Sequence, residues 1–536
     1  MRKIYLFLIL CACSVGSFAQ GTFSGDFQMN LNFFQRDSSI KASGNPLYDN
    51  YLNGNEGWLD LRYNNNGFTI FARADIFNNS NLKNPTQANT AFGIGAWSVS
   101  KDMKDLSITV GYIYTQIGSG ILFRAYEDRG LLIDNALVGI QLKYRLTDNI
   151  SMKGFTGQQK NNDLGTNPLT VSQRYAPIIK GFNIEGDFSL GKKQTTHLLP
   201  GIGILNRTLD QASMDAVVST INAQDLKTRF EPMYNMYAFS LYNTLTVGDF
   251  SWYAEGVYKT HEAILENNAL VDKPGNVVFT TLGYARKGLG INFTGKRTQD
   301  FVMRTSPNEI LLNGMLNWQP IVARIRPQRL MSRYTPASQE ISEIAGGVDV
   351  LIAPSEYLSF ITNYTHINTL DNVELYRELY LEADYQGFDS WVLEAGIQLM
   401  HYNQQIYQVR PNVPIIIAAT PFAEVTYKFD KKRSLRVEAQ YMDTKQDYGS
   451  WVFGLVEFNI APKWSISASD MYNVTPNYAL VNKANHYYNI YTSYTKGPHR
   501  FSLSYVKQVD GINCTGGVCR YEPAFSGIKA NITSSF

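Results

Sequence analysis

The chain has 536 residues, with 48 Lys and Arg against 46 Asp and Glu, and this near balance excludes the strongly basic footprint of a nucleic-acid-binding protein. Charged residues make up only 18% of the chain, whereas Tyr (34) and Gly (41) are abundant, which is unusual for a soluble α/β enzyme of this length. Beyond the N-terminus no apolar run approaches the ~18 residues that a membrane-spanning helix needs, so the remaining membrane option is a β-barrel.

A secretory signal peptide is predicted at residues 1–19. Arg2 and Lys3 precede an apolar stretch, and small residues precede the expected cleavage site, as such signals require. The alternative is a lipoprotein signal in which Cys13 carries the lipid. Either route removes Arg2 and Lys3, so the mature chain carries as many cations as anions. The sequence therefore predicts an exported protein whose one domain is residues 20–536.

Two cysteines remain in the mature chain, Cys514 and Cys519, within the segment C-T-G-G-V-C. The two glycines allow a tight turn that brings the cysteines together, and disulfides form in exported proteins. A metal site is the alternative, but no His or second Cys pair lies nearby in the sequence. We therefore expect a disulfide, and neither a metal nor a cofactor.

Polar and apolar residues alternate along most of the mature chain. At its start, Asp26 and Gln28 take one face while Phe27 and Met29 take the other. Further alternating segments occur at 59–63, 138–146, 391–399, 435–441 and 528–536. A period of two is typical of β-strands, because successive side chains of a strand point to opposite faces. The predicted fold class is all-β.

Three features favour a membrane barrel over a soluble sandwich. Tight connections alternate with long ones, Tyr and Trp recur near strand ends, and an alternating segment ends in Phe536. These features predict one antiparallel transmembrane barrel of the outer membrane, with about 24 strands (roughly 20 to 26). The long extracellular loops are expected notably at residues 117–137, 206–235 and 299–343. Because the first strand begins close to residue 20, we expect no N-terminal plug domain, which disfavours a TonB-dependent transporter.

The alternation places charged residues of both signs on the face that would line the lumen. They would either line a hydrophilic channel or pair across strands to fill a polar interior, and the second reading is favoured. This set consists of Asp60, Arg62, Arg73, Asp75, Lys143, Arg145, Glu185, Asp187, Glu378, Glu382, Glu394, Arg436 and Glu438.

Residues 117–137 contain too many Leu, Ile and Phe for a solvated loop. We expect this segment to fold against the inner wall as a constriction; an apolar cap that packs on neighbouring loops is an equally favoured alternative. Its charged residues are Arg124, Glu127, Asp128, Arg129 and Asp134.

A second long loop, residues 301–345, is basic. It would either bind anions or sugar chains, or clamp the acidic wall strand that holds Glu378 and Glu382, and the clamp is slightly favoured. Its clustered arginines are Arg324, Arg326, Arg329 and Arg333.

Catalytic motifs are absent from the sequence. There is no G-x-S-x-G and no H-E-x-x-H, and the six His residues are scattered without the spacing of metal ligands. We therefore expect a protein that is not an enzyme.

The chain resembles outer-membrane barrels of Bacteroidetes-type bacteria, and more narrowly an uncharacterised family known only as a domain of unknown function. Three segments carry the resemblance: F-R-A-Y-E-D-R-G-L-L-I-D-N-A-L at 123–137, L-L-N-G-M-L-N-W-Q-P at 311–320, and G-G-V-C-R-Y-E-P-A-F-S-G at 516–527. The resemblance implies a barrel over the whole mature chain and brings no established activity. Residues 321–336 depart from it, being richer in Arg and Pro than expected.

The function expected first is a porin-like channel of the cell outer membrane, for passive or weakly selective passage of small hydrophilic solutes. The alternative is a structural or accessory barrel, a subunit of a secretion, assembly or nutrient-uptake complex. The expected partners are outer-membrane lipid and lipopolysaccharide, together with proteins of such a complex; nucleic acid is not among them.

Overall fold

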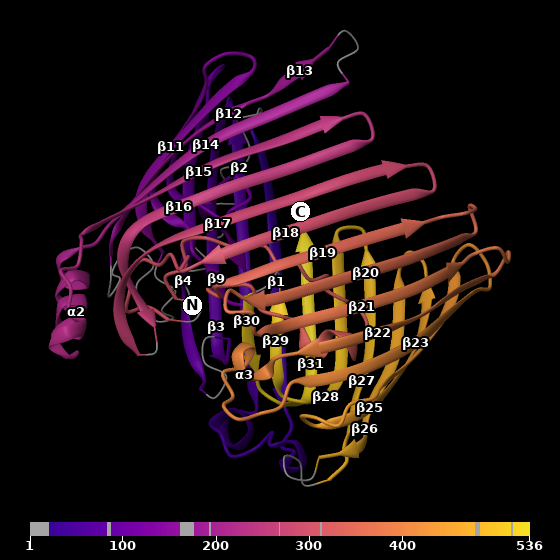
Figure 1. Cartoon of the computed structure of the whole chain (residues 1–536). Helices are drawn as coiled ribbons and strands as arrows, with labels where there is room; N and C mark the ends of the chain where they lie inside the picture. Colours follow the sequence, from indigo (N-terminus) through magenta and orange to yellow (C-terminus); the bar gives the residue numbers. More distant parts are fainter. Residues whose placement is uncertain are drawn as a thin grey trace, which may run out of the picture.

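The computed structural model describes residues 21–536 apart from 83–86, 161–175, 192–194, 267, 311–312, 478–482 and 516–517. The predicted signal peptide therefore lies outside the described residues. Antiparallel strands form one closed barrel of 24 strands, counting β12 and β13 as one because both pair with β14. The strands are strongly tilted (Figure 1).

In barrel order the strands are β1 (Thr22–Phe34), β2 (Asn53–Asn65), β3 (Phe68–Ser80), β4 (Asn89–Asp102), β5 (Leu106–Ile113), β10 (Leu137–Arg145), β11 (Ile150–Gln159), β12 (Ile178–Gly186) with β13 (Phe188–Leu190), β14 (Thr196–Thr208), β15 (Asn235–Val247), β16 (Phe250–Glu266), β17 (Ala269–Arg286), β18 (Leu289–Gln299), β19 (Glu343–Ile352), β20 (Leu358–Thr369), β21 (Glu374–Tyr385), β22 (Trp391–Tyr402), β23 (Ile416–Lys428), β24 (Arg433–Met442), β25 (Gly449–Ile460), β26 (Trp464–Pro476), β27 (His486–Lys496), β28 (His499–Gln508) and β31 (Phe525–Ser535). β31 pairs with β1 and closes the barrel. The predicted strand number is confirmed.

The two-residue period of the sequence sets which side chains face out. On β15, Leu241 is 66% exposed on the outer surface, while its neighbours Ser240 and Tyr242 are buried on the inner face. On β1 the even positions face inward, where Gln28 accepts a hydrogen bond from Arg129. The barrel is therefore apolar outside and largely polar inside, as alternation in a barrel requires.

Aromatic rings gather at the end of the barrel where the connections are short. Trp391 packs on Tyr427 with ring centroids 4.6 Å apart, and Trp464 packs on Tyr494 at 4.7 Å. Each of these residues lies within a few positions of a tight turn. The rings form an aromatic belt of the kind found at membrane interfaces.

Helices are few and short in the described chain. They are η2 (Ser38–Ile40), η3 (Leu47–Tyr51), α2 (Gln211–Asn222), η4 (Leu226–Thr228), η5 (Met331–Tyr334) and α3 (Gln404–Tyr407). α2 lies outside the barrel wall, at the left of Figure 1, and packs through Val217 and Ile221 on the β16–β17 hairpin. Among the described helices, none is long and apolar enough to cross a membrane.

The prediction of a barrel without a plug is wrong, because chain segments fill the lumen. The first insert, residues 114–136 between β5 and β10, contains β6 (Thr115–Ile117), β7 (Phe123–Ala125), β8 (Glu127–Asp128) and β9 (Ile133–Asp134). The second insert is residues 300–342, between β18 and β19. A terminal hairpin, β29 (Gly511–Thr515) and β30 (Val518–Glu522), lies between β28 and β31. Figure 1 shows β9, β29 and β30 within the outline of the barrel.

Contacts with opposite walls place the first insert inside. Its Ser119 donates a hydrogen bond to Glu255 on β16, and its Arg129 forms an ion pair with Asp60 on β2. Eight strands separate β2 from β16 around the barrel. Only a segment that crosses the interior reaches both walls.

Apolar packing explains why the first insert folds inward rather than into solvent. Ile117, Leu122 and Phe123 are fully buried against an apolar part of the inner wall, which includes Leu205. Burial of each such side chain is worth roughly 1.5–3 kcal/mol. Gly203 makes the contact possible, since a Cβ at this position would lie 2.4 Å from the Ile117 side chain.

Candidate functional site

An ion-pair network fixes the first insert to the wall. Arg73 of β3 is 3% exposed and donates to Glu127 and Asp134 of the insert at 2.8 and 2.7 Å, and to Asp75 of its own strand at 2.7 Å. Arg129 of the insert donates to Glu127 at 2.9 Å. The predicted constriction residues Glu127, Arg129 and Asp134 are thus brought together with Arg73, and their charges are balanced within one cluster.

Asp134 lies at the centre of this network. Besides Arg73, the Lys160 ammonium is paired with it, and the Tyr114 hydroxyl donates to its Oδ1 at 2.8 Å. Burial alone raises the pKa of the Asp134 carboxyl, but Lys160 and Arg73 outweigh burial and hold this pKa below its ordinary value. Asp134 is therefore a carboxylate at neutral pH and attracts both cations.

The other two charged residues of the first insert have local roles. The Asp128 carboxylate accepts a hydrogen bond from the Leu131 backbone N–H at 3.0 Å. The Arg124 guanidinium lies over the rings of Tyr126 and Trp318, 4.4 and 4.8 Å from their centroids. Arg124 therefore links the first insert to the second by cation–π contact.

The two inserts form one body in the lumen. The Arg124 backbone N–H donates to the Leu316 carbonyl, and the Trp318 N–H donates to the Gly120 carbonyl, both at 3.0 Å. The Asn135 side chain donates to the Met315 carbonyl at 3.1 Å. Since each insert is bonded to the other and to the wall, neither is a free loop.

A buried triad anchors the start of the second insert. Glu262 of β16 pairs with Arg207 of β14 at 2.9 Å and with Lys259 at 2.7 Å, and all three side chains are at most 3% exposed. Arg207 also donates to the Arg304 carbonyl at 3.1 Å, and Lys259 to the Val302 carbonyl at 2.8 Å. Arg207 and Lys259 thus bind the backbone of the second insert as well as the Glu262 carboxylate.

Arg326 fastens the middle of the second insert to the wall at β20 and β21. Its Nε donates to Glu378 Oε1 at 2.9 Å, and its Nη2 donates to the Asn363 amide oxygen at 2.8 Å. Its guanidinium also lies 3.7 Å from the centroid of the Tyr380 ring. The structure thus places Arg326 in the clamping position expected of the basic loop, whereas Arg324 pairs with Asp349 in an exposed ion pair.

Arg329 and Arg333 differ from Arg326, because within the described chain neither makes an ion pair. Both line a cavity of about 750 Å³ between the second insert, the terminal hairpin and the β25–β28 wall. The Arg329 side chain is exposed to the cavity, yet the surrounding lumen wall and the neighbouring Arg333 cation lower its pKa to about 10, against the attraction of Glu522. We refer to this space as the arginine cavity.

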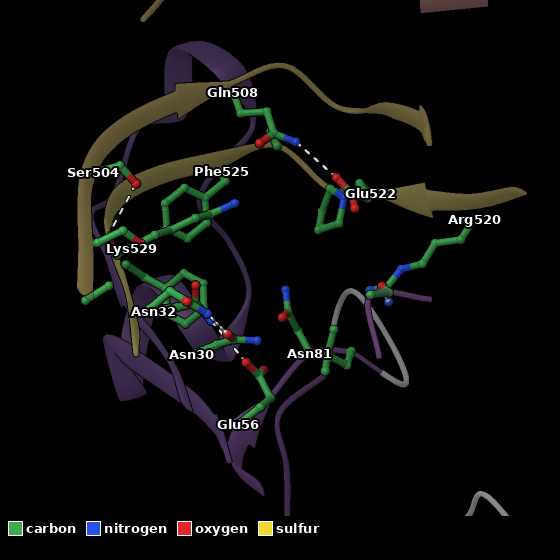
Figure 2. A pocket seen from close by; sticks show the side chains of 18 residues that line it. Asn30, Asn32, Glu56, Asn81, Ser504, Gln508, Arg520, Glu522, Phe525 and Lys529 are labelled. Atoms are coloured by element: carbon green, nitrogen blue, oxygen red, sulfur yellow. Dashed lines mark hydrogen bonds between the residues drawn. The ribbon is translucent and has the colours of Figure 1, made fainter. Parts of the chain in front are cut away.

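A smaller cavity of about 300 Å³ adjoins the arginine cavity, since Gln508 and Glu522 line both. Figure 2 shows it between β1, β2, β28, β30 and β31, with Arg520 and Lys529 among its cations. Gln508 Nε2 donates to Glu522 Oε2 at 3.2 Å, and Arg520 donates to the Gly130 carbonyl of the first insert at 3.0 Å. The smaller cavity therefore connects the arginine cavity to the first insert.

The remaining predicted lumen residues do not join this site. Arg62 and Arg145 make exposed pairs with Asp26 and Asp105 near the short turns, and Lys143 is exposed on β10. Arg436 lies among Glu424, Glu438 and Glu457 on the wall.

Carboxylate oxygens of Glu382, Asp384 and Glu394 lie within 4.8 Å of one another. Acidic groups of this kind are common without an ion, and we assign no metal to them.

Sequence reasoning missed Arg520, Lys529 and the buried Arg207–Glu262–Lys259 triad. Arg520 lies in one of the three segments that carry the family resemblance, and this position was the signal that could have identified it. In the same hairpin, Cys514 and Cys519 stand directly opposite each other across β29 and β30. The disulfide between them stays a prediction.

The three segments that carry the resemblance meet in the lumen. One buried cluster contains Leu131 and Ile133 from the first segment, Met315 from the second and Val518 from the third. The residues that resemble the family therefore build the body that fills the barrel.

Over residues 1–536 the sequence matches the family of unknown function DUF6029. The predicted relationship to an uncharacterised family is confirmed, while the Bacteroidetes origin stays a prediction. Among curated proteins, none matches this sequence.

Similar solved structures include three from two bacteria. The siderophore receptor PirA from Pseudomonas aeruginosa has a TM-score of 0.43 and 7% identity, over 97% of this chain and 81% of that one. A mutant of the ferric enterobactin receptor PfeA from the same organism has 0.42 and 9%, over 96% and 80%. The iron transporter FrpB from Neisseria meningitidis has 0.42 and 9%, over 96% and 82%.

These likenesses are too distant to carry an argument about function.

Proposed function

The chain belongs to the DUF6029 family, and from that premise we propose that it is an outer-membrane transport barrel for small hydrophilic solutes whose bore is narrowed by two inserts. The apolar outer face and the belt of aromatic rings support a location in the outer membrane, with lipid against the wall. Lipopolysaccharide would contact the end that carries the long connections. Passage is restricted rather than freely passive.

The observation that carries this proposal is the way both inserts are held. Each is fixed to the wall by buried ion pairs, around Arg73 in the first insert and around Arg326 in the second. Breaking such a pair by removing one partner costs about 3–5 kcal/mol. The inserts therefore occupy the bore as stable parts of the fold, and solutes pass around them or after one of them moves.

Single-channel conductance in planar bilayers tests the proposal. The variant replaces residues 119–133 with a Gly-Ser linker, which removes most of the first insert. The matched control replaces residues 211–222, the α2 helix that lies outside the wall. We expect small steps from the wild type and the α2 variant, and severalfold larger steps from the variant without the insert. A folded insert variant with wild-type steps would contradict the proposal.

The filled lumen also agrees with the second candidate, an accessory subunit of an outer-membrane complex. Mild detergent extraction followed by mass spectrometry separates the two candidates. A stoichiometric companion protein, together with unchanged conductance after removal of the first insert, would favour the accessory subunit.

A further inference from the structure

Arg329 and Arg333 are the starting point, because both line the arginine cavity. Within the described chain neither lies within 4.0 Å of a carboxylate oxygen in an ion pair, and the Nε of Arg333 is buried without a hydrogen-bond partner. A buried donor left unpaired costs about 1–3 kcal/mol. Two neighbouring guanidinium groups that face one cavity repel each other as well.

Three carboxylates, those of Asp447, Asp510 and Glu522, also line the cavity, and Glu522 accepts from Gln508 at 3.2 Å. Asp447 accepts from Arg410 at 3.0 Å and from the Tyr334 hydroxyl at 2.9 Å. Asp510 accepts from the Tyr521 hydroxyl at 3.2 Å. Arg329 and Arg333 therefore keep guanidinium donors that form no ion pair within the described chain, and an anion that enters the cavity can reach them.

Aromatic side chains form the floor of the cavity next to these charges. The Arg333 guanidinium lies 4.5 Å from the centroid of the Trp451 ring, and Tyr448 and Tyr487 also line this region. The volume of about 750 Å³ is that of a small-molecule site and is much larger than a lone inorganic anion needs. The wall suits a molecule with a flat apolar part beside its charge.

We propose that the arginine cavity binds a small organic anion, in which a carboxylate or phosphate group contacts Arg329 and Arg333 while a flat apolar part packs on the tyrosines. This proposal rests on the proposed function, since it names the class of solute that the barrel admits. Guanidinium groups suit both anions, because their forked donors match two oxygens at once. Arg520 and Lys529 line the adjoining cavity, where they would contact a second anionic group of the same molecule.

Isothermal titration of the detergent-solubilised full-length protein tests the site with three probes: phenyl phosphate, inorganic phosphate and phenol. We expect phenyl phosphate to bind most tightly, and the double variant Arg329→Gln/Arg333→Gln to bind it at least about tenfold more weakly. The matched control is Arg324→Gln, which removes an exposed arginine of the same insert outside the cavity and should bind like the wild type. Heat-dependent mobility in gels reports whether each variant is a folded barrel.

A measurement on the wild type alone keeps the test sharp even if the double variant does not fold. Raising the salt concentration from about 50 to about 500 mM should weaken phenyl phosphate binding severalfold and leave phenol unchanged. Phenol that binds as tightly as phenyl phosphate would overturn the anion site, and so would a folded double variant of wild-type affinity. Inorganic phosphate that binds as tightly as phenyl phosphate would overturn the aromatic part. Because binding is measured without a membrane, its failure is distinguishable from unchanged conductance after removal of the first insert.

Discussion

In the first insert the Arg129 guanidinium donates to Glu127 and Asp60. Arg73 on the wall donates to Glu127 and Asp134 of the insert and to Asp75 of its own strand. In the second insert Arg326 pairs with Glu378 and Arg304 pairs with Glu340, while Arg329 and Arg333 face a cavity. The inserts carry similar kinds of side chain and lie in the same lumen. Their difference separates charges that hold the fold from charges that are available to a solute.

The comparison also explains how one lumen can be both filled and functional. A fully paired network is stiff, because moving one member strands the others in a medium of low dielectric constant. Unpaired cations beside a cavity give up bound water but break no ion pair when an anion enters. The first insert is therefore suited to obstruct the bore. The part of the second insert around Arg329 and Arg333 is suited to bind a solute.

The largest effect is expected from Arg73→Ala, which removes the wall side of the first network. It leaves Asp75, Glu127 and Asp134 facing one another, so the free energy of unfolding should fall by about 3–5 kcal/mol. Denaturant unfolding in micelles, followed by tryptophan fluorescence, measures the change. Arg62→Gln is the control, because Arg62 and its partner Asp26 are both exposed, and it should change stability by less than about 0.5 kcal/mol. Equal stability of the Arg73→Ala and Arg62→Gln proteins would show that the Arg73 network does not hold the first insert.

A smaller effect, on channel conductance, is expected when the pH is lowered. Burial alone raises the pKa of the Asp134 carboxyl. In the folded protein, however, Lys160 and Arg73 hold this pKa below its ordinary value. A carboxyl with a lowered folded-state pKa contributes stability that is fully present above the unfolded-state value near 3.8 and is lost as the pH falls through the lower value. Channel conductance should therefore stay constant until the pH reaches 3.8 and rise as the pH falls further, when the first insert loosens.

Asp134→Asn is the comparison for this acid response. The variant cannot titrate at this position, so its conductance should be raised already at pH 5 and change less on acidification. An Asp134→Asn protein with the full wild-type response would assign the titration to another group.

The smallest effect on stability is expected from Arg329→Gln. Because this cation has no ion pair within the described chain and its side chain is exposed, its removal should change the free energy of unfolding by less than about 0.5 kcal/mol. The same unfolding measurement applies, with Arg324→Gln as the reference. A loss as large as that of Arg73→Ala would show that Arg329 holds the fold and would remove it from the set of free charges.

Most of the barrel could be predicted from the sequence, because the two-residue period is imposed by strand geometry alone. The alternation around Phe27 and Leu435 located strands without knowledge of their neighbours. The apolar content of residues 117–137 likewise indicated a segment that had to be buried. These properties are local, and local patterns survive in the sequence.

The filling of the lumen was less accessible, because it depends on contacts between distant segments. The expectation of a barrel without a plug considered only what preceded the first strand, whereas the lumen is filled from within the chain. Arg326 and Arg329 are close neighbours in the sequence, yet one meets Glu378 and the other a cavity. Which wall strand faces each arginine is set by the path of the insert, and no local pattern records that path.

The seam between β1 and β31 has a consequence for the order of assembly. Across it, Asn531 donates a hydrogen bond to Asn30, 501 positions away in the sequence, so the ring can close only after the whole sheet has been made. Contacts of such long range form late and slowly. A closed ring of paired strands has no side entrance, so once its edges have joined the inserts can enter only through the open end where their strands stop. The seam therefore divides two routes: the inserts fold within the curved, open sheet before closure, or they enter the finished ring through its end.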